Sequence, residues 1–325
     1  MIITRTPLRI SFAGGATDLP SFYRAYGGGA VTSAAIDRYV HVLVNPKFDR
    51  SIRVAYSRTE NVEKPAELQH ELVREAMHLT GVTEAVEVHT IADIPGEGTG
   101  LGSSSSLTVG LLNAFYAYRG LLREPAELAR EACEIEIDRL GGAQGKQDDY
   151  IAAFGGTEYF EFRADDSVRV SPIPLATRDR EALSDHLSLF YTGLTRKAGE
   201  LLQRQSERTG VNRPALERMR ELAGEARDAI VRRDFARLGR ILDEGWVLKR
   251  GLSSGISSAA IDAQYDAARA AGAWGGKITG AGGGGFLLLV HPPEQSRQIA
   301  QALSPMERLP VRITPEGSRI LFVSR

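Results

Sequence analysis

Apolar residues alternate with polar ones in parts of the first half of the chain, and elsewhere they recur at helical spacing. The alternation predicts strands at residues 2–12, 39–44 and 85–94, because successive side chains of a strand point to opposite faces. Apolar positions at helical spacing predict helices at residues 67–80 and 107–118. The first half therefore mixes predicted strands with predicted helices.

The second half has helical periodicity over most of its length. The predicted helices are residues 197–208, 214–233, 235–249, 257–271 and 293–303, and the predicted strands are 187–192, 286–290, 311–314 and 319–323. Pro172 and Pro174 mark a boundary between the halves. A chain of 325 residues exceeds the roughly 250–300 residues at which single cores stop growing. We therefore predict two domains, residues 1–175 and 176–325.

The composition is that of an ordinary globular protein, and its charge balance argues against nucleic acid and anionic membranes as partners. The 40 basic and 41 acidic residues leave a formal net charge of −1, which gives no electrostatic footprint for nucleic acid or an anionic membrane. The single cysteine, Cys133, excludes an internal disulfide framework and is interpreted as a packing residue. The sequence shows neither a signal-peptide core nor an apolar run of the roughly 20 residues that span a bilayer. A cytoplasmic protein is expected, and the six histidines lack the helical pairing typical of zinc sites.

A glycine- and serine-rich stretch, GTGLGSSSS at residues 98–106, lies between the predicted strand 85–94 and the predicted helix 107–118. Its alternate glycines permit a tight turn and a close approach to a ligand. Serines follow where a helix would begin, and such a terminus is an anion site because of its free N–H groups and dipole. A phosphate chain is the expected anion. The alternative is a flexible linker, which seldom lies between a strand and a helix of a compact domain.

Two further glycine turns carry charged side chains. Arg9 and Asp18 flank the turn that contains GGATD, and they form either a surface ion pair or an acid and a base that face a pocket. The turn at residues 141–150 has three glycines before a Lys-Gln-Asp cluster. This spacing suggests a backbone held close to a ligand, and the alternative is a solvated loop with two ordinary acids.

Glu136 is the unusual residue of a predicted helix over residues 125–140. It falls on the same face as Ala129, Ala132, Cys133 and Leu140, whereas the other acids of this segment share a polar face. A buried carboxylate without a partner costs several kcal/mol or becomes protonated. Glu136 therefore requires a buried cation, which is an arginine, a lysine or Mg²⁺.

The commonest nucleotide motifs do not fit these glycine loops. A Walker loop needs Gly, four residues and then Gly-Lys-Ser/Thr, and both Gly145-Lys146 and Gly276-Lys277 lack the first glycine and the final hydroxyl. Residues 280–285 match the Rossmann pattern formally, but they precede a predicted strand instead of opening a helix. The signatures of protein kinases are absent from the sequence.

Three stretches taken together resemble the signatures of the GHMP kinase superfamily. They are PLRISFAGGATD, GTGLGSSSS and GGKITGAGGGG, in this order along nearly the whole chain. Within the superfamily, GKQDDYIAAFGG and FYTGLTRKA are similar to the bacterial D-glycero-D-manno-heptose 7-phosphate kinases. The resemblance implies an α+β fold, with an N-terminal domain like domain 2 of ribosomal protein S5 and a ferredoxin-like C-terminal domain.

The resemblance also implies a role for each matching residue. Asp148 would be the catalytic aspartate and Arg9 the cation beside it, while Ser104 and Glu136 would hold Mg²⁺. The residues implied to bind ATP are Gly98, Gly100, Leu101, Gly102, Ser103, Ser104, Ser105, Gly280, Gly282 and Gly283. Those implied to bind the sugar are Asp18, Thr17, Gly14, Gly15, Gly145 and Lys146. A substrate that already carries a phosphate needs a second basic cluster, for which Arg196 and Lys197 are candidates; the alternative for these two is a solvated helix start.

Some positions depart from the pattern of the superfamily. Gly15 and Ala16 replace the Glu-His of galactokinases, which argues against galactose. Glu97 is an extra residue in the phosphate loop, where a carboxylate would have to face away from the phosphates. Asp149 stands where a glutamine is common.

The resemblance implies in-line transfer of the γ-phosphate of Mg·ATP to the anomeric hydroxyl of a heptose phosphate, a route to nucleotide-activated heptose. Asp148 would accept the hydroxyl proton. A kinase for an unphosphorylated sugar such as fucose or mannose, a small-alcohol kinase and a non-catalytic sugar and ATP sensor are the alternatives. The partner is a small molecule, and whether the chain forms a homodimer stays open.

Overall fold

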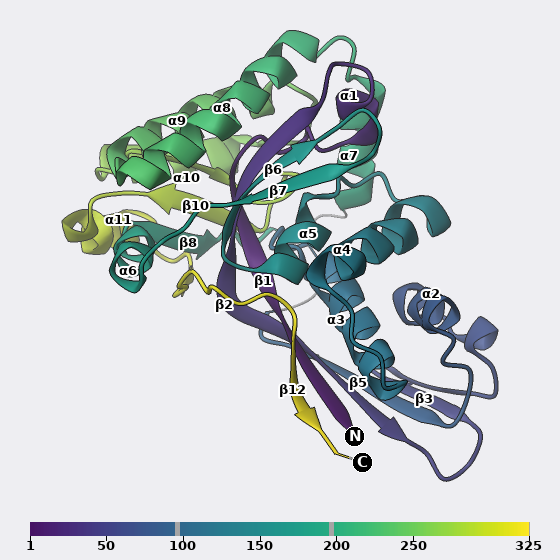
Figure 1. Ribbon diagram of the computed structural model, residues 1–325. Helices are drawn as coiled ribbons and strands as arrows, with labels where there is room; N and C mark the ends of the chain where they lie inside the picture. The colour runs from purple at the N-terminus through teal and green to yellow at the C-terminus, as the bar shows by residue number, and fades with distance from the viewer. Residues whose placement is uncertain (95–97, 195–197, 325) are drawn as a thin grey trace.

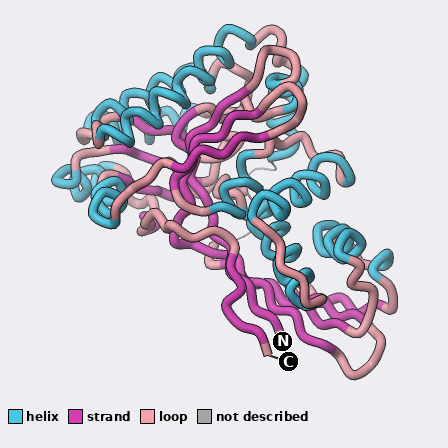
Figure 2. Tube along the Cα trace, in the orientation of Figure 1, coloured by secondary structure: helices cyan, strands magenta, loops and turns pink. Residues whose placement is uncertain are grey.

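The computed structural model describes residues 1–94, 98–194 and 198–324. The described residues form two sheets with helices packed on them (Figures 1 and 2). The first is an eight-stranded sheet with the order β12-β1-β2-β5-β3-β4, in which β6 also pairs with β2 and β7 with β6. The second is a four-stranded sheet with the order β11-β8-β10-β9.

The first sheet is built on two long strands. The strands β1 (Ile2–Ala13) and β2 (Gly29–Pro46) are antiparallel, and β2 pairs with β5 (Val86–Ala92) over one half and with β6 (Thr157–Phe162) over the other. The predicted strands at 2–12, 39–44 and 85–94 are thus confirmed, although 39–44 is only part of the longer β2. The smaller strands of this sheet are β3 (Ile52–Ala55), β4 (Thr59–Val62), β7 (Val168–Pro172) and β12 (Arg319–Val323).

Helix α3 (Ser103–Tyr118) lies against β1 and β2 and is buried nearly all round. It begins at Ser103, directly after Gly102 and four residues before the predicted start at 107. The N-terminus of the helix therefore lies inside the stretch 98–106, where the anion site is predicted. Its neighbours are α2 (Glu71–Thr80), α4 (Pro125–Cys133) and α5 (Gln147–Phe154). The remaining short elements of this half are α1 (Pro20–Tyr23) and the 3-10 turn η1 (Pro65–Glu67).

The predicted helix over residues 125–140 does not continue as one α-helix. After α4 the chain forms a π-helical segment, η2 (Glu134–Arg139). A π-helical segment adds one residue to a turn, which shifts every following side chain around the axis, and such segments often occur at functional sites. Glu136 lies in this segment and is buried.

The second sheet has the topology of a ferredoxin-like fold. Its strands are β8 (Leu187–Tyr191), β9 (Gly275–Ile278), β10 (Phe286–Val290) and β11 (Arg308–Leu309), all antiparallel to their neighbours. Numbered along the chain their order is 4-1-3-2, with helices after the first and third strands, which is the β-α-β-β-α-β pattern. The helices are α6 (Thr177–Asp185), α7 (Ala198–Glu207), α8 (Arg213–Arg232), α9 (Phe235–Arg250), α10 (Ala259–Ala270), the 3-10 turn η3 (Pro293–Gln295) and α11 (Ser296–Ala302).

The end of the chain returns to the first sheet. The strand β12 pairs antiparallel with β1, as the adjacent termini in Figure 1 show. The predicted strand at 319–323 is confirmed, whereas the one predicted at 311–314 is wrong apart from a bridge between Ile36 and Ile313. The division into residues 1–175 and 176–325 stays a prediction, and β12 follows the second sheet in sequence while it lies in the first. None of the described helices is long and apolar enough to cross a membrane.

Candidate active site

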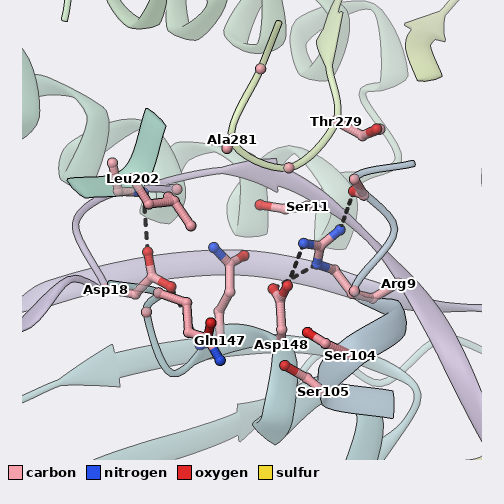
Figure 3. Close-up of a pocket in the computed structure, with 18 of the residues that line it drawn as sticks. Arg9, Ser11, Asp18, Ser104, Ser105, Gln147, Asp148, Leu202, Thr279 and Ala281 are labelled. Atoms are coloured by element: carbon pink, nitrogen blue, oxygen red, sulfur yellow. Dashed lines mark hydrogen bonds and ion pairs between the residues drawn. The ribbon is translucent and has the colours of Figure 1, made fainter. Parts of the chain in front are cut away.

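A cavity of about 680 Å³ opens where the glycine loops of the two halves meet. Its lining comes from β1 and the turn after it, the start of α3, the start of α5, α7, α9 and the loop between β9 and β10. Figure 3 shows Asp18 and Leu202 at one side of this cavity, Ser104 and Ser105 at the other, and Gln147 and Asp148 between them. Among the predicted site residues, those that line the cavity are Arg9, Gly15, Asp18, Gly98, Gly100, Gly102, Ser103, Ser104, Ser105, Gly145, Asp148, Gly280 and Gly282.

The phosphate loop has the backbone that its glycines predict. Gly98, Gly100 and Gly102 have φ values of 74°, 70° and 80°, a left-handed region that side chains other than glycine rarely adopt. The loop ends at the N-terminus of α3, where Ser104 is exposed and Ser103 Oγ has no partner among the described residues. Unpaired N–H groups and the helix dipole at this point favour a phosphate.

The third glycine motif packs directly on the phosphate loop. A Cβ atom on Gly280 would lie 2.7 Å from Gly100 Cα, and one on Gly100 would lie 2.7 Å from the Thr279 carbonyl oxygen. Thr279 Oγ1 donates to the Thr99 carbonyl oxygen at 3.1 Å. The glycines of both loops are therefore required by a close backbone approach between the two halves.

Arg9 and Asp148 form a bidentate ion pair on the cavity wall. Arg9 Nε donates to Asp148 Oδ1 at 2.7 Å and Nη2 to Oδ2 at 2.5 Å, while Nη1 donates to the Gly100 carbonyl oxygen at 2.6 Å. Asp148 lies in the first turn of α5, where the helix dipole favours an anion. Such a fork fixes the plane of the carboxylate, so the structure joins the predicted catalytic pair to the phosphate loop.

Glu136 lies behind the phosphate loop, and the described side chains that hydrogen-bond to it are all neutral. Ser105 Oγ donates to its Oε2 at 2.9 Å, Thr108 Oγ1 donates to its Oε1 at 2.6 Å, and the Gln144 amide donates to Oε2. Burial raises the pKa of Glu136 to about 7, against the effect of these hydroxyl groups. Neither an arginine nor a lysine side chain contacts Glu136 in the described ranges. Of the three predicted partners, the arginine and the lysine are therefore absent around Glu136 in that part of the chain.

These contacts test whether a divalent cation suits Glu136. Glu136 is 2% exposed, and no described cation compensates its charge. Hydroxyl and carboxylate oxygens are ligands that Mg²⁺ prefers. The residues present therefore fit a cation. No cluster of three or more histidine, cysteine, aspartate or glutamate side chains arranged for a metal occurs among the described residues, so phosphate oxygens and hydroxyls would have to complete such a site.

Asp149, at the position where a glutamine is common, is fully buried. Cys133 Sγ lies 3.3 Å from its Oδ2, and its Oδ1 has no partner in the part of the chain that the structure describes. Burial, followed by the charge of Glu136, raises the pKa of Asp149 well above its usual range. Burial also raises the pKa of the Cys133 thiol, which supports the interpretation of Cys133 as a packing residue and not a nucleophile.

Asp18 faces the cavity from the side opposite the phosphate loop. The Ala16 N–H donates to its Oδ1 at 3.0 Å and the Gln147 N–H to its Oδ2 at 3.4 Å. A Cβ atom on Gly145 would lie 2.0 Å from Asp18 Oδ2, which explains the glycine there. Burial, followed by the charge of Asp148, raises the pKa of Asp18.

Other predicted substrate residues have structural contacts instead. Thr17 Oγ1 lies 2.7 Å from the Gly14 carbonyl oxygen and accepts the Ala30 N–H at 3.0 Å, and a Cβ atom on Gly14 would lie 1.9 Å from the Ala30 carbonyl oxygen. Lys146 Nζ donates to the Asp166 carbonyl oxygen at 2.8 Å. Thr17, Gly14 and Lys146 do not line the cavity, so their positions add no support to a contact with substrate.

Two predicted nucleotide residues also lie outside the lining. The Leu101 carbonyl oxygen accepts the Arg9 backbone N–H at 2.9 Å, and the Gly283 N–H donates to the Ile256 carbonyl oxygen at 2.8 Å. Their backbone hydrogen bonds hold the two glycine loops in place, and the two residues do not face the cavity. Arg196 and Lys197, predicted as candidates for a substrate phosphate, lie outside the described residues, and so does Glu97, whose orientation the sequence left open.

Sequence reasoning missed several polar residues of the cavity wall, among them Lys249, Lys277, Gln205 and Ser11. Lys249 continues the apolar stripe of α9 that holds Leu242 and Trp246. A charged residue on an apolar helix face is the same pattern that identified Glu136, so the sequence contained a signal for Lys249 as well. Lys277 stands inside the third glycine motif, where it was considered only as part of a failed Walker loop.

Comparison with known proteins gives consistent matches in sequence and structure. Residues 67–156 match the GHMP kinases N terminal domain and residues 226–306 match GHMP kinases C terminal. The chain is 32% identical to the D-glycero-alpha-D-manno-heptose 7-phosphate kinase of Campylobacter jejuni over 93% of each chain. It is 31% identical to a mevalonate kinase of Thermococcus sibiricus, over 76% of this chain and 74% of the relative.

The structure is similar to that of a D-glycero-D-manno-heptose 1-phosphate kinase from Bacteroides thetaiotaomicron, with a TM-score of 0.83, 26% identity and full coverage of both chains. A galactokinase of Lactococcus lactis has a TM-score of 0.77 at 18% identity and shares the fold.

Fold, cavity and relatives together define a phosphotransferase that acts on a sugar hydroxyl. The chain belongs to the GHMP kinases, a family that uses ATP as its phosphate donor. The predicted α+β GHMP kinase fold is confirmed.

Proposed function

We propose that this sugar kinase transfers the γ-phosphate of ATP to the anomeric hydroxyl of D-glycero-D-manno-heptose 7-phosphate and so serves the synthesis of nucleotide-activated heptose. The observation that carries the proposal is the Arg9–Asp148 pair, which lies between the phosphate loop and Asp18. Similarity to the heptose 7-phosphate kinase of Campylobacter jejuni over 93% of each chain supports the choice of sugar.

In this proposal Asp148 is the general base. Its carboxylate accepts the proton of the anomeric hydroxyl as that oxygen bonds to the γ-phosphorus and the bond to the bridging oxygen of ADP breaks. Arg9 holds the carboxylate plane through its two hydrogen bonds and can bind oxygens of the transferred group. Positioning and electrostatics supply most of the acceleration in such transfers.

Glu136 and Ser104 would hold Mg²⁺, and Ser105, which hydrogen-bonds to Glu136, would orient that carboxylate. When bound, the ion supplies charge neutralisation at the phosphate oxygens. The N-terminus of α3, with its unpaired N–H groups, stabilises the same phosphates from the protein side. Asp18, fixed by the N–H groups of Ala16 and Gln147, would bind hydroxyls of the sugar.

A panel of acceptors tests the proposal. ADP release from Mg·ATP is measured with heptose 7-phosphate, free heptose, mannose, fucose and mevalonate at equal concentrations. The proposal expects the highest kcat/KM with heptose 7-phosphate. A higher kcat/KM with mannose or fucose would replace it with the kinase for an unphosphorylated sugar, and one with mevalonate would replace it with a small-alcohol kinase.

A further inference from the structure

Two lysine side chains in the cavity wall have no acidic partner among the described residues. Lys249, in the last turn of α9, and Lys277, in β9, both line the cavity and are 5% and 7% exposed. Lys249 Nζ donates to the Gly280 carbonyl oxygen, and Lys277 Nζ lies 3.5 Å from the Phe12 carbonyl oxygen. Neither ammonium group forms an ion pair with a described carboxylate.

Both ammonium groups therefore carry the cost of a buried charge. Burial lowers the pKa of Lys249 to about 8, and burial together with the charge of Lys249 lowers the pKa of Lys277 well below its usual range. Each ammonium has three N–H donors, of which the described contacts use one. Such a pair gains most from an anion that offers several acceptor oxygens, as a phosphate does.

The nucleotide phosphates already have donors on another wall. The N-terminus of α3 and Ser104 line the cavity at the phosphate loop and would face phosphates bound there. Lys277, by contrast, approaches the end of β1 at Phe12, next to Ser11, whose buried Oγ lines the cavity and has no described partner. The charges of Arg9, Asp18 and Asp148 act on both ammonium groups, and the charge of Lys249 also acts on Lys277. The two lysines therefore lie close to each other, and Lys277 adds its positive charge beside Ser11.

We propose that Lys249 and Lys277 form a subsite for a phosphate monoester carried by the acceptor, with the Ser11 hydroxyl as a further donor. The inference rests on the proposed function and assigns the residues that distinguish a sugar phosphate from a free sugar. It replaces no role of Asp148 or Arg9, which act on the reacting hydroxyl and the transferred group. The same chemistry suits the γ-phosphate of ATP, so the experiment must separate the two sources.

The variants Lys249→Met and Lys277→Met remove each charge and keep a side chain of similar length. The matched control is Lys64→Met, at an exposed position remote from the cavity. For each protein kcat/KM is measured with heptose 7-phosphate and with free heptose, and KM is measured for ATP. The loss with heptose 7-phosphate is expected to exceed the loss with free heptose by about 10–100-fold in both cavity variants, whereas Lys64→Met is expected to lower neither.

A binding measurement without nucleotide gives a second readout. Heptose 7-phosphate is expected to raise the Tm of the wild-type protein more than free heptose does, and this difference is expected to shrink in both cavity variants. Because neither lysine forms an ion pair with a described carboxylate, neither variant is expected to lower the Tm of the ligand-free protein. This result distinguishes a binding role from a structural ion pair.

Equal losses with the two acceptors would overturn the subsite. So would a rise confined to the KM for ATP, which would assign the lysines to the nucleotide phosphates. A wild-type enzyme that phosphorylates free heptose but not heptose 7-phosphate would instead overturn the proposed function. A wild-type enzyme that uses heptose 7-phosphate while the variants do not discriminate would overturn the subsite alone.

Discussion

Asp148 is held by two hydrogen bonds from Arg9 at the first turn of α5. Asp148→Asn keeps the size of the side chain and removes the proton acceptor, so kcat is expected to fall by about 10²–10⁴-fold. Affinity for ATP, measured by calorimetry, is expected to stay nearly the same. Asp266→Asn, at an exposed position of α10, is the control. Equal turnover of Asp148→Asn and wild type would exclude Asp148 as the base.

Glu136 is predicted to set the requirement for Mg²⁺. Glu136→Gln removes the buried charge, and the Mg²⁺ concentration that gives half-maximal activity is expected to rise by about 10–100-fold, the usual effect of altering a metal site. Glu134→Gln, in the same π-helical segment but paired with Arg139 on the surface, is the control. An unchanged Mg²⁺ requirement in Glu136→Gln would contradict the assignment.

Glu158 on β6 predicts a pH dependence of stability that has no connection with catalysis. It is buried, its Oε2 has no partner among the described residues, and burial raises its pKa from 4.5 to about 7. Between these pH values the folded state holds more protons than the unfolded state. The stabilising contribution is thus fully present below pH 4.5 and is lost as the pH rises through 7.

Glu158→Gln is therefore expected to stabilise the protein at pH 8 by about 1–3 kcal/mol, and to have a much smaller effect at pH 4.5. Urea unfolding at the two pH values measures the difference, with Glu161→Gln on the same strand as the control. A stability difference that is the same at both pH values would refute the prediction.

At the residue scale, the buried acid of the site was predictable from the sequence, whereas the two buried lysines were not predicted. Glu136 was found because an acid on an apolar helix face has no ordinary explanation. Lys249 shares an apolar stripe in the same way, but a lysine in the last turn of a helix is also expected from the helix dipole. Lys277 lies in the short strand β9, where the two preceding glycines leave too few side chains to show an alternation of apolar and polar residues. Thr17 and Lys146 were predicted to bind substrate, but their side chains bind backbone carbonyl oxygens instead. A sequence motif does not show which of its side chains contact the ligand and which contact the protein.

At the scale of elements, the site depends on the contact between two glycine loops. Gly280 has a φ of 62°, and a Cβ there would lie 2.7 Å from Gly100 Cα. Gly280→Ala is expected to push the loops apart, to raise the KM for ATP about tenfold or more, and to destabilise the protein by about 1–3 kcal/mol. ATP kinetics and thermal unfolding measure the two effects.

Gly224 is the matched control for this substitution. It lies inside α8, and a Cβ there would meet no atom within 4 Å, so Gly224→Ala is expected to stabilise the helix by about 0.5–1 kcal/mol. A Gly280→Ala variant with the KM and stability of the wild type would show that the two loops do not have to touch.

The long elements were predictable because their periodicity is strong. The strand at residues 286–290 and the helices at 214–233 and 235–249 are confirmed within a residue or two. The π-helical segment at Glu134–Arg139 was not predictable, because one inserted residue changes the helical period too little to be seen in a single turn. The short helix α5 was missed since Gly141, Gly142 and Gly145 before it indicated only a loop.

At the scale of the whole molecule, the cavity exists because both sheets contribute to it. The first half supplies Arg9, the phosphate loop and Asp148, and the second half supplies the loop at residues 279–285 and the two lysines. The return of the chain to pair β12 with β1 places the last strand beside the strand that carries Arg9. The order of the motifs predicted which segments meet, but long-range strand pairing of this kind leaves no local signal in the sequence.

The proposed reaction moves a phosphate from ATP to the anomeric oxygen of heptose 7-phosphate. Phosphorus NMR of the reaction with Mg·ATP tests it most directly, because the technique identifies the oxygen that receives the phosphate. We expect one new anomeric phosphate resonance for each ADP formed, with the original phosphate unchanged, and no such product with Asp148→Asn. Formation of ADP with free inorganic phosphate alone, or of a product phosphorylated at a different hydroxyl, would contradict it.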